Sequence, residues 1–398
     1  AENTSIGRSA FYNNTTGSCN ISIGNESLNA NTTGDSNVAI GLCALNDNTT
    51  ANNNTAVGYT ALKANTTGTR NTAVGQNSLK VNTTGNENAS FGNLSLDANT
   101  TGCKNNAFGD SALTGNTTGC CNVAIGNAAL SSNTTAGDNT AVGINALTSN
   151  TTGDLNTAVG KCALAANTTA SNNVAVGEVA LRLNTTGENN TAIGRAGLAA
   201  NTTGDDNIAV GCGALCSNTT ASNHTAVGSC ALKANTTGQQ NTAVGACAGN
   251  LVTTGDNNIL LGASAGIDAM IQVTTADHQI VLGNNTHTNA TIKIDWTVTS
   301  DLRDKTEIKD VPYGLNFVNQ ITPIKYKFKT SREDETPTGR ARFGFKAQEI
   351  LELEGNNPVL VNNDDEDNLK LTGAYLVPVL VNAIKELKAE IDELKKDK

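Results

Sequence analysis

A serine and a lysine stand five positions apart at the point where the chain changes composition. Ser300 is followed by Asp301 and then by Lys305. A serine hydroxyl becomes a strong nucleophile when a neighbouring base takes its proton, and Ser-Lys pairs are one arrangement that does so. Lysine can be this base only where burial or nearby positive charge lowers its pKa, and Arg303 could supply the charge. Asp301 could orient the pair or stabilise the local fold, and the spacing alone often arises by chance.

The composition on either side of Ser300 indicates a domain boundary. The last 99 residues hold 16 of the 26 Lys and Arg and all five Pro, whereas all ten Cys precede residue 250. The chain carries a net charge of −10 and no basic patch, which argues against nucleic acid as a partner. The longest apolar run, 375–384, is too short to span a bilayer, so we expect no membrane insertion. Without an initial Met or a secretion signal, we expect a fragment or a processed chain.

The first two thirds of the chain repeat every 17 residues. One glycine recurs at this step from Gly7 to Gly262, giving sixteen units without an insertion. Such strict length is typical of a solenoid, because one extra residue would disturb the stacking of coil on coil. At ~4.8 Å per coil the units would form a rod of about 70 Å. Helix and disorder are the alternatives; the Asn, Thr and Gly content argues against the first and the unbroken apolar register against the second.

The pattern within a unit predicts two short strands. A large residue such as Val57 precedes the glycine, a small one such as Ala56 precedes that, and Leu62 follows four positions after Gly58. We expect the large residues to fill a thin core and the glycines, including that of each "TTG", to turn corners with positive φ. So thin a core would be marginal. We therefore expect a homotrimer, with three rolls packed about an axis through the small-residue face.

Residues 1–262 resemble the head repeats of trimeric autotransporter adhesins, which form parallel β-rolls. The likeness is carried by units such as "NTAVGYTALKANTTG" at 54–68, and it indicates architecture more than function. The 263–299 segment departs from the repeat and alternates apolar and polar residues, so it predicts a neck of strands in which Trp296 packs. Stacking of Trp296 on a carbohydrate is the alternative.

Several recurring polar residues in the repeats have two interpretations. Fourteen "NTT" motifs, from Asn14 to Asn235, are glycosylation acceptors by sequence, but we expect a ladder of Asn amides. Stacked Thr raises ice binding, which adjacent Thr on opposite faces argue against. Most cysteines are expected to be small unpaired thiols, with disulfides as the alternative for pairs on successive coils: Cys103 with Cys120, and Cys230 with Cys247. His224, His278 and His287 each stand alone, so we expect no metal and no cofactor.

Residues 300–398 resemble the C-terminal intramolecular chaperone domain of endosialidases and other phage tail spikes and fibres. The likeness rests on Ser-Asp-x-Arg-x-Lys from Ser300, "YGLNFVNQITPIKYKF" at 313–328, "GFKAQE" at 344–349 and a closing helix. The resemblance implies a domain that drives trimerisation and then cleaves itself from the fibre. Carried onto this chain, Ser300 is the nucleophile, Thr299–Ser300 the scissile bond and Lys305 the base.

The closing helix, 374–398, has the spacing of a coiled coil. The heptad positions are Leu380, Ile384, Leu387, Ile391 and Leu394. A single amphipathic helix lying on its own domain is the alternative.

Taken together, these features predict a mainly β chain with a trimeric β-roll shaft (1–262), a β neck (263–299) and a small α+β chaperone (300–398). The expected function is a viral or phage tail fibre in the virion that attaches to a host receptor, expected to be a glycan. The expected chemistry is one self-cleavage by a serine endopeptidase, without multiple turnover. Alternatives are an extracellular trimeric adhesin that uses the same chaperone and an ice-binding solenoid. The repeats offer no paired carboxylates in a pocket, which argues against a glycan hydrolase.

Overall fold

The structure is a computed structural model of the chain, and its residues fall into two compact units. One unit is formed by Ala1–Ile267 and Gln272–Asn284, and the other by Asp268–Ile271 and Asn285–Lys398. The residues that the structure describes are 2–268, 272–287, 300–329, 332–356, 358–363, 366–367 and 369–396.

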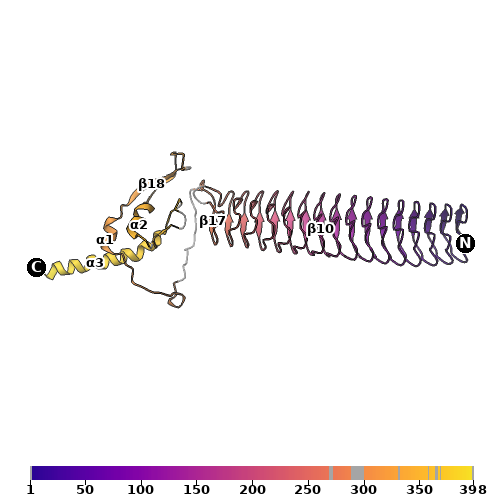
Figure 1. The fold of residues 1–398 in the computed structure, drawn as a ribbon, viewed down its shortest axis with the longest axis horizontal. Helices are drawn as coiled ribbons and strands as arrows, with labels where there is room; N and C mark the ends of the chain where they lie inside the picture. Colours follow the sequence, from indigo (N-terminus) through magenta and orange to yellow (C-terminus); the bar gives the residue numbers. More distant parts are fainter. Residues whose placement is uncertain are drawn as a thin grey trace. The chain divides into compact units, whose positions relative to one another are not determined.

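The first unit is a parallel solenoid in which each coil contributes one three-residue strand to a single 17-stranded sheet (Figure 1). Neighbouring strands pair in parallel and in chain order, as Ala56 does with Ala73. The strands are β1 (Thr4–Ile6), β2 (Ile21–Ile23), β3 (Val38–Ile40), β4 (Thr55–Val57), β5 (Thr72–Val74), β6 (Ala89–Phe91), β7 (Asn106–Phe108), β8 (Val123–Ile125), β9 (Thr140–Val142), β10 (Thr157–Val159), β11 (Val174–Val176), β12 (Thr191–Ile193), β13 (Ile208–Val210), β14 (Thr225–Val227), β15 (Thr242–Val244), β16 (Ile259–Leu261) and β17 (Ile280–Leu282). The predicted solenoid of 17-residue coils is confirmed.

The ladder continues beyond Gly262. Strand β17 pairs with β16 so that Ile280 lies beside Ile259, which is a step of 21 residues instead of 17. The other predicted strand residues of the neck, among them Trp296, lie outside the described residues.

Each coil has one strand, so the prediction of two was wrong. The segment that follows the repeat glycine is a turn in which Thr60 and Leu62 both take a φ of 52°. Its N–H groups still bond to neighbouring coils: Thr60 N donates to Leu42 O and Leu62 N to Ser78 O, each at 2.9 Å. These bonds between coils hold leucine in the left-handed region, which a sequence rule based on isolated residues assigns to glycine.

The core of the solenoid differs from the prediction in which residues of each coil point inward. Leu62, Ala61 and Ala56 are all 0% exposed, so the leucine lies inside as predicted but the small residues lie beside it. The large residue before the glycine points outward, as at Ile40, which is 37% exposed. The interior is too narrow for two large residues per coil, because a buried side chain must fit its volume without strain. The predicted packing of three rolls through a small-residue face is therefore wrong in its choice of face.

Two ladders of buried asparagines run through the coils. In the corner ladder, Asn48 Nδ2 donates to Asn31 Oδ1 at 2.8 Å and to Ala51 O at 3.1 Å. In the strand ladder, Asn54 N donates to Asn37 Oδ1 at 3.0 Å. The corner asparagines from Asn31 to Asn235 are 0% exposed. The Asn ladder is present as predicted, and the folded coil leaves no room for a sugar on these amides.

The repeat glycine is required by both φ and space. Gly58 has a φ of 136°, and a Cβ there would lie 2.5 Å from Gly75 O of the next coil. The glycine of "TTG" differs, because its φ is not positive and alanine occupies the same position at Ala51 and Ala136, which are each 2% exposed. The prediction of positive φ is therefore confirmed at the repeat glycine and wrong at the glycine of "TTG".

We predict that Gly58→Ala lowers the free energy of unfolding by about 2–4 kcal/mol, because alanine is strained at the φ of 136° that this position requires. The matched control is Gly68→Ala: a Cβ there would also lie close to the next coil, 2.4 Å from Gly85 O, but the φ of Gly68 is not positive and other coils already carry alanine at this position. Thermal unfolding followed by circular dichroism measures both. Equal midpoints for the two variants would contradict the assignment.

His224 takes the place of an asparagine in the strand ladder. Its backbone N–H donates to Asn207 Oδ1 at 3.1 Å, and its Nδ1 accepts the N–H of Asn241 at 3.1 Å. The side chain is 1% exposed. Burial lowers the pKa of His224 to about 4, against the smaller opposing effects of the Asn241 and Gly238 backbone and of Asp256.

We predict that His224 makes the shaft sensitive to acid. Its folded pKa lies below the unfolded value, so stability is full above about pH 6.5 and is lost as the pH falls from there through about 4, by about 3 kcal/mol in all. Urea unfolding at pH 7.5 and 4.5 measures the loss. His224→Asn restores the ladder residue and should reduce the loss, whereas His278→Asn, at an exposed position, should not. An undiminished loss in His224→Asn would refute the prediction.

The second unit is a small α+β domain that ends in a long helix. Strands β18 (Ile324–Lys329) and β19 (Pro337–Gly344) pair antiparallel, as do β20 (Val361–Asn362) and β21 (Lys370–Leu371). Its core contains Phe317, Ile350, Leu360, Val361, Leu376 and Val379. The elements are η1 (Leu302–Asp304), α1 (Leu315–Gln320), β18 (Ile324–Lys329), β19 (Pro337–Gly344), α2 (Ala347–Glu354), β20 (Val361–Asn362), β21 (Lys370–Leu371), η2 (Gly373–Tyr375) and α3 (Leu376–Lys396).

Helix α3 has one face in this core and another in solvent. Leu376, Val379 and Ala383 are buried. The five predicted heptad residues are instead 39–68% exposed: Leu380, Ile384, Leu387, Ile391 and Leu394. They therefore do not lie on their own domain, and the coiled coil stays a prediction.

Candidate active site

The chain around Ser300 folds into one short turn. Asp301 is the N-cap of η1, and its Oδ1 accepts the backbone N–H of Arg303 at 2.9 Å. Lys305 ends the turn, with its N–H donating to Leu302 O at 3.2 Å. An aspartate at an N-cap favours such a turn because its carboxylate satisfies an otherwise free N–H. The turn reverses the chain enough for residues 300 and 305 to meet.

The two predicted catalytic side chains are in contact. Lys305 Nζ donates a hydrogen bond to Ser300 Oγ at 2.8 Å. This lies within the reach of about 2.6–3.2 Å that proton transfer requires. Both side chains are exposed in the single chain. The geometry allows the amine, once neutral, to take the hydroxyl proton.

Asp301 and Arg303 pair with each other and not with the serine and lysine. Arg303 Nη2 lies 2.6 Å from Asp301 Oδ2, and Arg303 Nε donates to Asp301 Oδ1 at 3.1 Å. The hydrogen bonds from Arg303 hold the pKa of Asp301 below its usual range, so the carboxylate stays charged. Asp301 thus shapes the turn, and the guanidinium of Arg303 is paired with Asp301. Thr299, on the other side of the predicted scissile bond, lies outside the described residues.

The segment after Lys305 is attached to α3. Asn382 Nδ2 donates to Val311 O at 3.0 Å and to Tyr313 O at 3.4 Å, and Tyr313 stacks on Phe317 with ring centroids 4.3 Å apart. Since an amide that bonds two backbone carbonyls fixes a chain segment, Asn382 ties the segment that leads from the turn to the helix.

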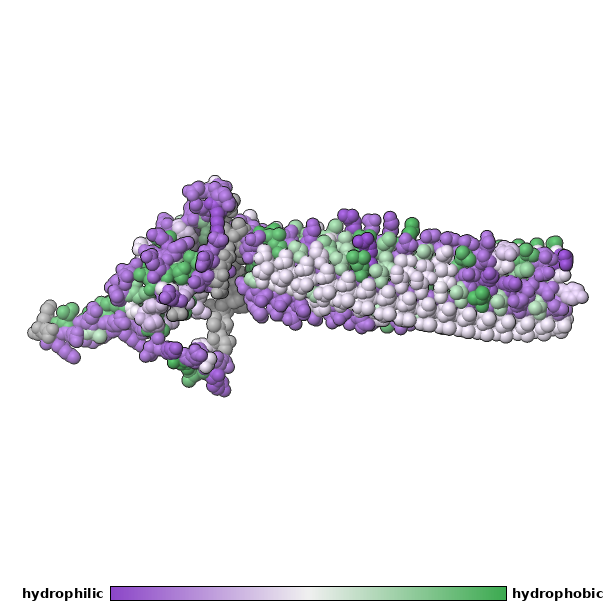
Figure 2. Space-filling model, viewed as in Figure 1, coloured by the Kyte–Doolittle hydropathy of each residue, from purple (hydrophilic) through white to green (hydrophobic). Residues whose placement is uncertain are grey.

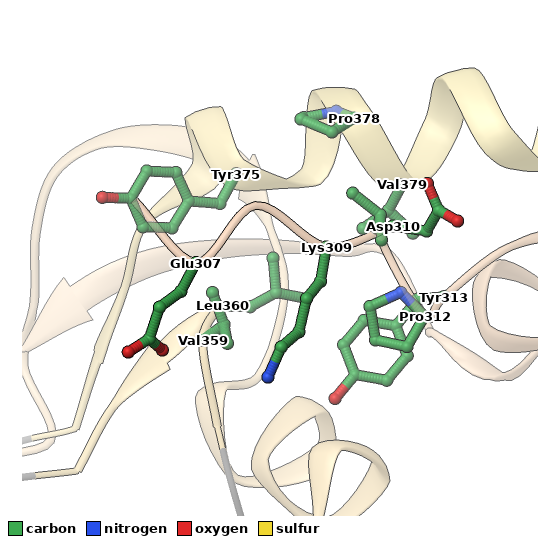
Figure 3. Close-up of a pocket in the computed structure, with 11 residues that line it drawn as sticks. Glu307, Lys309, Asp310, Pro312, Tyr313, Val359, Leu360, Tyr375, Pro378 and Val379 are labelled. Carbon is green, nitrogen blue, oxygen red and sulfur yellow. The ribbon is translucent and has the colours of Figure 1, made fainter. Parts of the chain in front are cut away.

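A hollow of about 560 Å³ lies along the same segment (Figure 3). Glu307 and Lys309 come from the segment, Tyr375 from η2 and Pro378 from α3. The hollow is lined mainly by apolar and aromatic groups. The turn with Ser300 is not among its walls, so the hollow is not the site of the candidate chemistry.

Sequence reasoning missed Asn382 and Glu354. One carboxylate, that of Glu354, accepts the N–H groups of Val359 and Leu360 at 2.8 Å and of Val361 at 3.0 Å. A glutamate in the last turn of a helix is unfavourable to the helix dipole, and this was the available signal that Glu354 has a partner elsewhere. Asn382 carried no comparable signal.

Among the residues that the structure describes, no three or more His, Cys, Asp or Glu are placed to hold a metal ion. Nor does any helix in that part of the chain combine the length and apolarity needed to cross a bilayer.

The fold and the turn together define a small domain that begins with a Ser-Lys contact and that follows a β-solenoid in the sequence. Residues 300–359 match the family model for the chaperone of endosialidase, so the match begins at Ser300 itself. The predicted resemblance is confirmed: residues 300–359 of the C-terminal unit are similar to the chaperone of endosialidase. A search of curated proteins found no match.

Proposed function

We propose that the chain is a trimeric structural fibre whose C-terminal domain directs assembly and then cleaves itself from the shaft between Thr299 and Ser300. The observation that carries this proposal is the 2.8 Å contact of Lys305 Nζ with Ser300 Oγ, at the first residue of the family match.

The chemistry follows from the position of the serine next to its own peptide bond. Lys305, as a neutral amine, takes the hydroxyl proton, and Ser300 Oγ attacks the carbonyl carbon of Thr299. The peptide C–N bond breaks, so Thr299 is held as an ester on Ser300 and the Ser300 amine is freed. Water then hydrolyses the ester. The products are a shaft that ends in a Thr299 carboxylate and a chaperone that begins at Ser300, with one water consumed.

Exposure of the site favours cleavage after assembly. A lysine that acts as a general base works best in a desolvated site, whereas Lys305 is exposed in the single chain. A second copy packed over the turn would supply that burial. The same contact would exclude bulk water from the site until the ester forms.

Two exposed apolar stripes support self-association. All seventeen third residues of the strands are Val, Ile, Phe or Leu, and none is buried. Phe91 and Phe108 in this column stack with centroids 4.7 Å apart, and apolar groups are visible along the shaft in Figure 2. The second stripe is the exposed face of α3. Continuous apolar surface of this extent is typical of an interface, so we place the seam of the trimer on these two stripes.

A fibre of this kind fits a viral or phage tail that attaches to a host surface, because endosialidase-type chaperones serve such fibres. A cell-surface adhesin with the same chaperone is the rival. Ice binding is less well supported, since Thr in the first strand position is interrupted by Ile21, Val38, Ala89 and Asn106, which breaks a regular hydroxyl array.

We predict that the expressed chain is cut once and releases a fragment that begins at Ser300, as measured by intact mass and denaturing electrophoresis. Ser300→Ala and Lys305→Ala remove nucleophile and base, so each should leave only the full-length chain. The control Lys327→Ala removes an exposed lysine of β18 and should be cut as wild type. Wild-type chain that assembles but stays whole would refute self-cleavage.

We predict that Ile384→Asp prevents assembly without unfolding the domain, because Ile384 is 66% exposed and its apolar surface would be covered only by another copy. In the uncut Ser300→Ala background, sedimentation should give trimer for the parent and monomer for the variant. Lys385→Glu, beside the stripe, should remain trimeric. In the chain with Ser300 intact, Ile384→Asp should also abolish cleavage; efficient cleavage by a monomer would separate the two steps and contradict their coupling.

A further inference from the structure

Cys103 and Cys120 occupy a column of positions at the coil corner, each directly after the glycine of a "TTG" motif. At this position the backbone N–H of one coil donates to the side chain at the same position of the next. Thr69 N, for example, donates to Asn86 Oδ1 at 2.7 Å. Cys103 N donates in the same way to Cys120 Sγ at 3.0 Å. The column therefore directs the Cys120 side chain toward the preceding coil, where Cys103 lies.

The two sulfur atoms are 2.8 Å apart. A disulfide bond is about 2.05 Å long, so the sulfurs need to approach by less than about 1 Å. Stacked coils are spaced by ~4.8 Å, which is within the ~4.4–6.8 Å between Cα atoms that a disulfide accepts. The bond can form with little movement of either coil.

Small oxidants can reach the pair. Both cysteines are partly exposed. Cys103 also lines a surface hollow of about 290 Å³ together with Arg70, Glu87 and Lys104. Reactivity of a thiol requires such access as well as a suitable partner.

Other cysteines of the shaft lack this arrangement. Cys230 and Cys247 also lie 17 residues apart on consecutive coils, but their sulfurs are not in hydrogen-bond contact, and Cys230 Sγ accepts instead from Ser229 Oγ at 3.8 Å. Cys121 is adjacent to Cys120 and exposed. Spacing along the chain is therefore not sufficient, and the corner column distinguishes the pair.

We propose that Cys103 and Cys120 form an intrachain disulfide that staples two consecutive coils of the shaft under oxidising conditions. With a peroxide as the oxidant, Cys120 takes one oxygen to become a sulfenic acid and one water is released; Cys103 then attacks that sulfur and a second water leaves. Two thiols and one hydrogen peroxide yield one disulfide and two waters, so the sulfurs lose two electrons and the peroxide gains them.

The order of the two steps follows from the hydrogen bonds. The bond to Cys120, followed by burial, raises the pKa of Cys103 to about 11, so Cys103 keeps its proton. Cys120 is therefore the sulfur that reacts first, and the hydrogen bond from the Cys103 N–H holds it beside Cys103. Cytosolic conditions would keep both thiols reduced, and the staple would form after the fibre reaches an oxidising medium. It would then stop these two coils from separating.

The test uses the full-length reduced chain, a brief treatment with hydrogen peroxide near one equivalent, and alkylation of remaining thiols with N-ethylmaleimide. Trypsin cleaves after Lys104 and so separates the two cysteines, and mass spectrometry without reduction should find peptide 81–104 linked to peptide 105–161. We expect this link to form at least about tenfold faster than any Cys230–Cys247 link. Non-reducing electrophoresis should show a single-chain band.

Cys120→Ser should abolish the link and Cys121→Ser should retain it. The proposal is overturned if Cys103 and Cys120 stay alkylatable, if the link runs through Cys121, if it joins two chains, or if Cys230 and Cys247 link equally fast.

Discussion

The shaft depends on one constraint: each buried asparagine amide must meet its partner in the adjacent coil. An unpaired buried polar group costs about 1–3 kcal/mol, so a shift of one residue would be penalised at both ladders. This explains why the step stays at 17 residues and why His224 is tolerated, since its Nδ1 accepts the same N–H that an asparagine oxygen would. It also explains where the corner ladder ends. Val252 follows Asn235 in that column, and Asn235 Oδ1 is left buried without a donor.

The same constraint creates a problem of register for a multichain assembly. Hydrogen bonds that repeat identically cannot distinguish one coil from the next, so two shafts displaced by one coil would lose contacts only at their ends. A distinct domain at one end would set the register before the shafts close along their length. The exposed face of α3 is suited to this task, because its apolar residues are held outward by Leu376 and Val379 in the domain core.

The sequence was sufficient to predict features that repeat along the chain and features that involve residues close together in the chain. The 17-residue step, the buried leucine, the Asn ladder and the meeting of Ser300 with Lys305 could all be anticipated. The direction of Ala56 could not, because alternation identifies two faces without saying which is inside. Positive φ at Leu62 depends on hydrogen bonds to other coils, and the role of Asn382 depends on its hydrogen bonds to a segment about 70 residues away. Such interactions are set by tertiary contacts that no local pattern encodes.

The exposure of the Ser300–Lys305 pair bears on the order of events. A dyad that is active within one chain would cut before assembly and would remove the domain proposed to set the register. In this chain five residues and one turn bring the groups together, so what a single copy lacks is burial rather than geometry. If neighbouring copies supply that burial, cleavage occurs only after the trimer has formed. Cleavage then removes the C-terminal domain only from shafts whose register is already fixed, and because the cut is hydrolytic, the order cannot be reversed.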